Sequence, residues 1–443
     1  MKAKKHLSFS SLRKSLSETF RAIPDWRQAS KVTHTIHDVL MSGFACMYFQ
    51  DPSLLQFQTR MQEDQHQNNL RTLFDVKNIP KETQMRSMID EVDSHYFRSI
   101  FKDFYLRLQR GKHLERYQLF SGLYYFPIDG SQFFSSEEVH CEQCLTKKRN
   151  KKEGEVITYS HQVLQGGIMH PDCAEVIPFM PEQIVNSDGK TKQDCEMNSA
   201  KRFVLKLRES HPQLGLIIGG DALFSKQPII EDVLAQDMHY IFAAKPDDHT
   251  YLMEWVDTYE QLHEIKFEDE KRRQHHYEWM EDVPLNGQEK TIKVNFFRCT
   301  VTGKNKRGKE VVLYKNSWVT DLAISADNIK MLVRGARCRW KNENECFNVM
   351  KNHGYFMEHN YGHGKKNLCF NFYLLTLLAF FFHQIFELTD RQYQACRKKF
   401  GSKKHLWEKL RAWIDILIFD TWEKLLDFAL APKVGLLTWA QAP

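Results

Sequence analysis

The sequence predicts an α/β protein in which helical regions flank a core that contains a β-sheet, and two observations support this class. The hydrophobic period changes near residue 121, from helical spacing to short apolar runs that end at acidic residues or glycines. From there to residue 250 such runs alternate with helical patterns, as in a sheet covered by helices. We expect a helical region at 1–120, the first part of the core at 121–250, a β-rich insertion at 251–322, the second part of the core at 323–390 and a helical region at 391–443.

Composition indicates a globular protein, because 42% of the 443 residues are hydrophobic and 13% are aromatic. The net charge is only +6, but the positive residues are clustered. Lys147, Lys148 and Arg149 open one basic run, and further runs lie at 2–5 and 397–404. Clustered positive charge suits the phosphates of DNA, and a solvated surface is the alternative for each run taken alone.

The cysteines and the apolar segments favour a cytoplasmic protein. Ten cysteines are scattered without a regular framework, and we recognise no signal peptide, so free thiols in a reducing compartment are expected. The apolar run 368–386 approaches membrane-spanning length, but it contains Asn371, His383 and Gln384. We therefore expect a buried helix there and no membrane.

The first region carries helical patterns at 10–20, 39–49 and 80–90, the last of which we expect to start at Pro80. A DNA-binding domain and a packing scaffold are both compatible with these helices.

Two predicted apolar strands each carry an acidic residue directly after a run of apolar residues. The strand at 124–134 presents Asp129, and the strand at 214–224 ends at Asp221. Ligand sites of open sheets lie at such strand ends, although a strand-end aspartate is also a common turn cap. Further strands are expected at 159–170, 175–179 and 239–245, with helices at 194–210 and 227–235. In the insertion, 291–300 and 311–314 are expected to pair as antiparallel strands around the glycine turn 303–308.

A helix is expected from Trp340 to Lys351, with Arg339, Glu343 and Phe347 along one face because they are spaced by four residues. The alternative to a functional helix is a solvated surface helix with a structural ion pair. Together with Asp129 and Asp221, Glu343 would supply the three carboxylates that two Mg²⁺ ions need for phosphoryl transfer.

Five short motifs resemble those of the DDE transposases of bacterial insertion sequences, in particular the cut-and-paste group with a β-rich insertion before the catalytic glutamate. They are Ile-Asp-Gly at 128–130, Asp-Gly-Lys-Thr-Lys-Gln-Asp-Cys-Glu at 188–196, Gly-Asp-Ala at 220–222, Arg-Trp-Lys-Asn-Glu-Asn at 339–344 and Glu-His-Asn-Tyr-Gly-His-Gly at 358–364.

The resemblance implies a ribonuclease H-like core in which Asp129, Asp221 and Glu343 are the catalytic residues and bind two Mg²⁺ ions, with Mn²⁺ as a possible substitute. It also implies cleavage at the ends of an insertion element, transfer of the 3′-hydroxyl into target DNA, and a dimer on double-stranded DNA. Arg339 would hold a phosphate or orient Glu343, and the run that begins at Lys147 would bind DNA.

The chain departs from the signature of that group at two positions. Ala336 occupies the tyrosine position and Met350 the lysine position, with Lys351 one residue later. One residue turns a side chain by about 100° around a helix, so the phosphate contact of Lys351 is in question. Glu345 is the rival for the third acid, but Lys341 rather than an arginine then precedes it by one turn.

Two other functions remain open on the sequence. The departures are compatible with a DNA-binding relic or regulator that has lost catalysis, against which stands the presence of all three acids. A hydrolytic nuclease of the same fold, which cuts without strand transfer, is the other alternative.

Three further groups of residues have no assigned role. Cys141 and Cys144 form a C-x₂-C that His161 could complete as a zinc site, but without a second such pair we favour incidental thiols. The 358–364 segment, with His359, Tyr361 and His363, would contact DNA, order the active-site loop or form a tight turn. Lys192, Asp194 and Glu196 are explained by the capped start of a helix.

Overall fold

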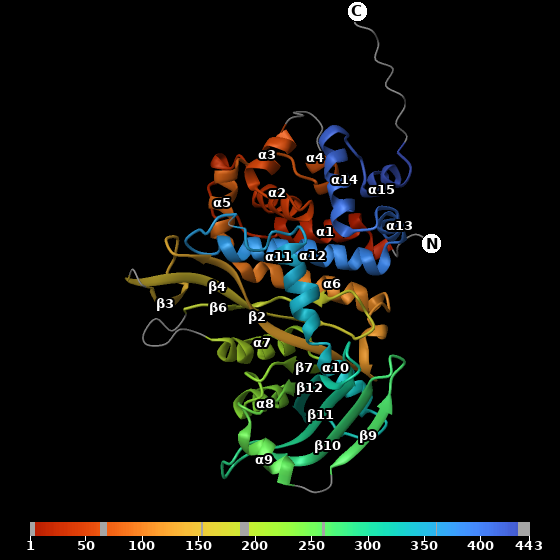
Figure 1. Cartoon of the computed structure of the whole chain (residues 1–443). Helices are drawn as coiled ribbons and strands as arrows, with labels where there is room; N and C mark the ends of the chain where they lie inside the picture. The colour runs from red at the N-terminus through yellow and green to blue at the C-terminus, as the bar shows by residue number, and fades with distance from the viewer. Residues whose placement is uncertain are drawn as a thin grey trace, which may run out of the picture.

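The computed structural model confirms the α/β class: a large mixed sheet lies beside a layer of helices (Figure 1). It describes residues 5–62, 69–151, 154–186, 195–258, 262–359 and 361–432.

The first region is helical, as predicted. Its helices are α1 (Phe9–Arg21), α2 (Ile36–Tyr48), α3 (Leu54–Gln62), α4 (Asn69–Phe74), α5 (Glu82–Glu91) and α6 (Arg98–Arg110). Side chains of Ser8 and Thr35 cap α1 and α2 by accepting backbone N–H groups. Pro80 stands two residues before α5, so our prediction that it starts this helix is wrong.

The C-terminal helices are α12 (Leu368–Thr389), α13 (Arg391–Phe400), α14 (Lys403–Ile416) and α15 (Trp422–Leu430). Within the described chain α12 is the one helix long and apolar enough to cross a membrane, and 94% of its apolar window is buried inside the molecule. It packs against α2 and α5. This confirms the buried helix expected at 368–386.

The two ends of the chain form one helical layer. Asn69 Nδ2 donates hydrogen bonds to the carbonyl oxygens of Ile414 (2.9 Å) and Leu417 (2.8 Å). Arg60 forms an ion pair with Asp415 at 2.9 Å. Figure 1 shows the N-terminal helices beside α13–α15 at the same end of the molecule. Two regions that look separate in the sequence therefore share a core.

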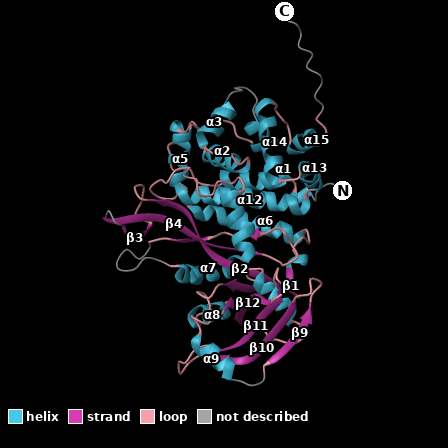
Figure 2. Ribbon diagram, in the orientation of Figure 1, coloured by secondary structure: helices cyan, strands magenta, loops and turns pink. Residues whose placement is uncertain are grey.

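The sheet has mixed strand directions (Figure 2). Its central path runs β3-β4-β2-β7-β8-β12-β11-β10-β9, in which β2, β7 and β8 are parallel and the other neighbours are antiparallel. The strands are β1 (Gln118–Phe120), β2 (Leu123–Ser136), β3 (Leu145–Lys151), β4 (Gly154–Ile168), β5 (Ile177–Pro178), β6 (Glu182–Ile184), β7 (Gly215–Gly220), β8 (His239–Ala243), β9 (His263–Glu268), β10 (Gln274–Pro284), β11 (Lys293–Lys304) and β12 (Glu310–Thr320).

The β-rich segment extends this sheet. The antiparallel pairing of β11 and β12 around the glycine turn is confirmed. Trp318 of β12 lies opposite Ala243 of β8, so the strands of the segment continue the central sheet instead of interrupting it.

Helices of the core are α7 (Glu196–Ser210), α8 (Gln227–Ala235), α9 (Thr250–Thr258), α10 (Ile329–Arg337), a π-helical turn (Asn342–Phe347) and α11 (Asn348–Asn352). The ring of Phe203 on α7 lies 6.0 Å from that of Phe126 on β2, which seats this helix on the sheet. The predicted start of α7 near Asp194, together with Lys192, lies outside the described residues.

Candidate active site

The parallel pairing of β2 with β7 brings two of the predicted acids side by side. Pro127 lies opposite Gly219, so Asp129 and Asp221 follow at equivalent positions two residues later. Neighbouring strands are about 4.8 Å apart. Asp221 follows the last residue of β7, as predicted.

Asp129 does not stand at a strand end, which corrects our expectation. Its strand, β2, continues to Ser136, and Asp129 itself lies opposite Gln165 of β4. The apolar run ends just before Asp129, because the residues of β2 up to Pro127 pair with the buried strand β7. From Ile128 onward β2 pairs with β4. The two acids thus mark the point where β2 and β7 part.

The segment that carries Glu343 is anchored to the same strands. The side chain of Asn342 is fully buried and donates to the carbonyl oxygen of Gln165 at 3.0 Å. The Lys341 ammonium donates to the carbonyl oxygens of His170 and Cys173. These contacts hold the first turn of the segment on the sheet and leave Glu343 exposed beside it.

The predicted stripe of Arg339, Glu343 and Phe347 is wrong. Residues 342–347 form a π-helical turn, in which hydrogen bonds span five residues and a spacing of four no longer keeps side chains on one face. Phe347 is buried whereas Glu343 is exposed. The guanidinium of Arg339 forms its ion pair with Asp129, at 3.8 Å.

Asp221 and Glu343 both act on the carboxyl group of Asp129. Burial raises the pKa of Asp129 to about 6, Arg339 opposes this effect, and the carboxylates of Asp221 and Glu343 add to it. Glu343, rather than its rival Glu345, is among the groups that raise this pKa. The structure therefore brings together the three acids named from the sequence.

A fourth carboxylate, that of Glu196, belongs to the same group. Burial raises the pKa of Glu196, and Asp129 and Asp221 raise it further. A Cβ atom at Gly130 would lie 2.3 Å from Glu196 Oε1, so the glycine leaves the space that this carboxylate fills. We call Asp129, Asp221, Glu196 and Glu343 the acid cluster. The sequence placed Glu196 in a motif but gave no reason to join it to the aspartates.

The basic residues line a cleft that reaches the acid cluster. This cleft, of about 880 Å³, is lined by Lys147 and Arg149 of β3 and by Glu196. Lys148 does not line it, because alternate side chains of a strand point to opposite faces, and it forms an ion pair with Glu155 at 2.8 Å. The basic run is thus divided between two faces.

The atypical signature positions are explained by packing. Met350 is fully buried and Ala336 is 3% exposed, so both belong to the core. Lys351 forms an ion pair with Glu358 at 2.9 Å.

The 358–364 segment separates its three residues. His359 is exposed, and the hydroxyl of Tyr361 donates to the carbonyl oxygen of Asp51. His363 lies with Cys141, Cys144 and His161. The sequence suggested a zinc site for Cys141, Cys144 and His161, but it gave no reason to include His363.

Comparison with known proteins supports a role in transposition at a coarse level. Residues 17–105 match the family model described as DDE_Tnp_1-associated. The chain is thus associated with DDE-family transposases. The match runs from the last turn of α1 through α2–α5 to most of α6 and includes none of the acid cluster. No curated protein matches the chain.

Proposed function

We propose that this protein is a DDE transposase that cleaves DNA at the ends of an insertion element and joins the 3′-hydroxyl to target DNA in a Mg²⁺-dependent reaction. The observation that carries the proposal is the meeting of Asp129, Asp221 and Glu343, from three separate parts of the chain, at one point of the sheet. The family match to the N-terminal helices supports it independently.

Strand order supports a ribonuclease H-like core. Three antiparallel strands, β3-β4-β2, are followed by the parallel strands β7 and β8. The first acid lies on β2 and the second directly after β7, on adjacent parallel strands. A sheet of this kind, with both aspartates at neighbouring strands, supports the ribonuclease H-like core that the resemblance implies. The segment β9–β12 lies between β8 and the Glu343 segment, where the resemblance implies the β-rich insertion.

The acid cluster fits hard divalent cations. Its donors are carboxylate oxygens, which Mg²⁺ and Mn²⁺ prefer, and the four carboxylates gather beside one ion-paired guanidinium, that of Arg339. Asp129, Asp221 and Glu343 would hold two ions. When bound, such ions supply Lewis acidity to the attacking and leaving oxygens of an in-line displacement at phosphorus.

The remaining side chains would orient DNA. Arg339 is held to Asp129 by a long contact of 3.8 Å, so its guanidinium keeps donors for a phosphate next to the acids. Lys147 and Arg149 would bind the backbone along the cleft, with an affinity that falls steeply as salt rises. Two element ends must meet for transposition, so we expect a dimer on DNA.

A cleavage assay tests the proposal. A labelled duplex that contains the DNA flanking the gene is incubated with Mg²⁺ and the wild type, Asp221→Asn, Glu343→Gln or the matched control Glu345→Gln. We expect cutting and 3′-end transfer by the wild type and the control, and binding without cutting by the other two.

Other results would overturn it. Binding of the wild type without cutting, in Mg²⁺ and in Mn²⁺, would favour a DNA-binding relic. Cutting without transfer of the 3′ end would favour a hydrolytic nuclease. Full activity of Glu343→Gln would remove Glu343 from the site.

A further inference from the structure

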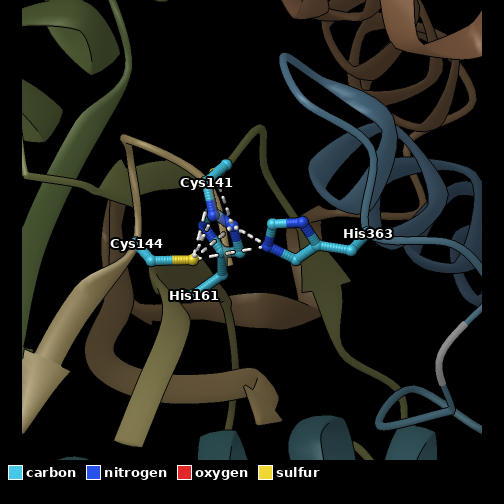
Figure 3. A group of neighbouring side chains, drawn as sticks. All are labelled: Cys141, Cys144, His161 and His363. Carbon is cyan, nitrogen blue, oxygen red and sulfur yellow. Dashed lines mark hydrogen bonds between the residues drawn. The ribbon is translucent and has the colours of Figure 1, made fainter. Parts of the chain in front are cut away.

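Two cysteine and two histidine side chains converge at a mostly buried point beside β4. They are Cys141, Cys144, His161 and His363, and we call them the Cys–His cluster (Figure 3). Three of the four residues are less than 9% exposed, and Cys141 is half-buried. Each donor atom lies within 4.8 Å of every other.

The distances have the pattern of a tetrahedron around one ion. They are 3.9 Å for Cys141 Sγ–Cys144 Sγ, 3.5 Å for Cys141 Sγ–His161 Nε2, 3.4 Å for Cys144 Sγ–His161 Nε2, 3.3 Å for Cys144 Sγ–His363 Nε2 and 3.1 Å for His161 Nε2–His363 Nε2. With Zn–S bonds of about 2.3 Å and Zn–N bonds of about 2.05 Å, tetrahedral edges are about 3.8 Å between sulfurs, about 3.6 Å between sulfur and nitrogen and about 3.3 Å between nitrogens. These five distances follow the same order and lie within about 0.3 Å of the tetrahedral values.

A second interaction prepares one histidine as a ligand. Nδ1 of His363 lies 2.8 Å from the carbonyl oxygen of Gly364, to which it donates in the tautomer that leaves the Nε2 lone pair toward the cluster. The rings of Phe133 and Phe134 lie 6.0 Å and 5.8 Å from that of His161, and their apolar faces restrict access of water.

We propose that the Cys–His cluster binds one Zn²⁺ ion through four protein ligands and that this ion is structural. Two thiolates and two imidazoles are a common donor set of structural zinc, and four ligands leave no position for substrate. A two-iron cluster is disfavoured because it places its cysteine pair and its histidine pair on different metals, whereas sulfur and nitrogen here approach to 3.3–3.5 Å. This revises our sequence-based preference for incidental thiols.

The ion would fasten two parts of the chain that are remote in sequence. Cys144 immediately precedes β3, the strand of Lys147 and Arg149, and His161 lies on β4. His363 lies in the loop that follows α11, downstream of Glu343. The zinc would therefore fix the basic strand relative to the segment that carries the third acid. The metal site itself does not depend on the proposed transposase activity.

Metal analysis of the full chain, purified without a histidine tag, tests the site. We expect about one zinc per chain, and less than about a tenth of this in Cys144→Ser and His363→Ala. The matched controls are Cys396→Ser, a buried thiol on α13, and His359→Ala, an exposed histidine of the same loop as His363; both keep the zinc. Asp221→Asn also keeps it, which separates this site from the acid cluster.

A rescuing variant and the absorption spectrum of the Co²⁺-loaded protein test the site even where Cys144→Ser or His363→Ala fails to fold. His363→Cys supplies a third thiolate and should retain zinc. Wild type refolded with Co²⁺ should show the intense visible absorption of a tetrahedral thiolate site. A wild-type chain without stoichiometric metal, or one that carries iron, would overturn the proposal, as would zinc retained by both Cys144→Ser and His363→Ala.

Limited proteolysis tests the fastening role. Removal of zinc should speed tryptic cleavage after Lys147 and Arg149 by at least about tenfold, because β3 is an edge strand of the sheet and loses the anchor at Cys144. Readdition of Zn²⁺ should restore protection. Equal cleavage with and without zinc would overturn this role.

Discussion

The acid cluster and the Cys–His cluster share two parts of the chain but differ in their chemistry. Both draw on the β2–β4 region and on the segment between Arg339 and Gly364. The acid cluster borders an open cleft and collects like charges that add to the raised pKa values of Asp129 and Glu196. The Cys–His cluster is mostly buried, and its four donor atoms lie within 4.8 Å of one another.

This difference between the two clusters predicts how each of them affects the stability of the folded protein. A catalytic metal site must keep open positions for substrate, so it tolerates electrostatic repulsion in the metal-free protein. A structural site is closed, and its binding energy contributes to folding. Variants in the two clusters should therefore separate activity from stability.

The largest expected effect is the loss of catalysis in the acid cluster. Asp221→Asn should slow DNA cleavage by about 10³-fold or more, equivalent to roughly 4 kcal/mol, because a metal ligand loses its charge. Single-turnover rates with labelled duplex measure this, and the zinc content and DNA affinity should stay within about twofold of the wild type. A similar rate loss in Glu345→Gln would contradict the assignment.

The second prediction concerns stability and pH. In the metal-free chain the raised pKa of Asp129 makes its ionisation costly, since the carboxyl titrates near 3.8 when unfolded and near 6 when folded. The folded state binds the proton more tightly, so the penalty is absent below pH 3.8, grows as pH rises and is complete above about pH 6. By linkage it amounts to roughly 2–3 kcal/mol.

Asp129→Asn should therefore raise the unfolding free energy of the metal-free protein at pH 7.5 and change it little at pH 3.5. Denaturant titrations at the two pH values measure the difference. Saturating Mg²⁺ should stabilise the wild type and not the variant. Equal stability of wild type and variant at both pH values would show that ionised Asp129 carries no such penalty in solution.

Variants of Glu196 test whether this fourth carboxylate contributes to cleavage. We expect Glu196→Gln to slow cleavage by about 10–100-fold, the range typical of residues that support metal ligands, with DNA affinity preserved. The conservative variant Glu196→Asp should recover part of the rate. Unchanged kinetics in Glu196→Gln would restrict the functional cluster to three acids.

The smallest effects are expected in the basic strand. Lys147→Ala and Arg149→Ala should each weaken DNA binding several-fold and lower the slope of log affinity against log salt by about 1. Lys148→Ala, on the opposite face and paired with Glu155, is the matched control and should change the slope less. Equal slopes for all three variants would mean that DNA does not follow the cleft.

Much of the local structure could be predicted from the sequence. Apolar spacing located α1, α2 and α5, and apolar runs located β2 and β7, because these patterns reflect which side chains each element buries. Asp129 and Asp221 could be singled out for the same reason: each follows an apolar run directly.

The geometry of the candidate site depended on long-range packing. The π-helical turn at 342–347 separated Phe347 from the face of Glu343, and no local spacing distinguishes such a turn from an α-helix. Glu196 joins the aspartates only because α7 docks where Gly130 leaves space.

The sequence by itself therefore determined the elements and the identity of the acids, since secondary structure and burial follow local periodicity. The tertiary structure alone decided which side chains share a site. The parallel register of β2 and β7 paired Asp129 with Asp221, and the loop after α11 carried His363 to Cys144, 219 residues away. Register and docking are set by contacts between remote segments, which a linear pattern does not encode.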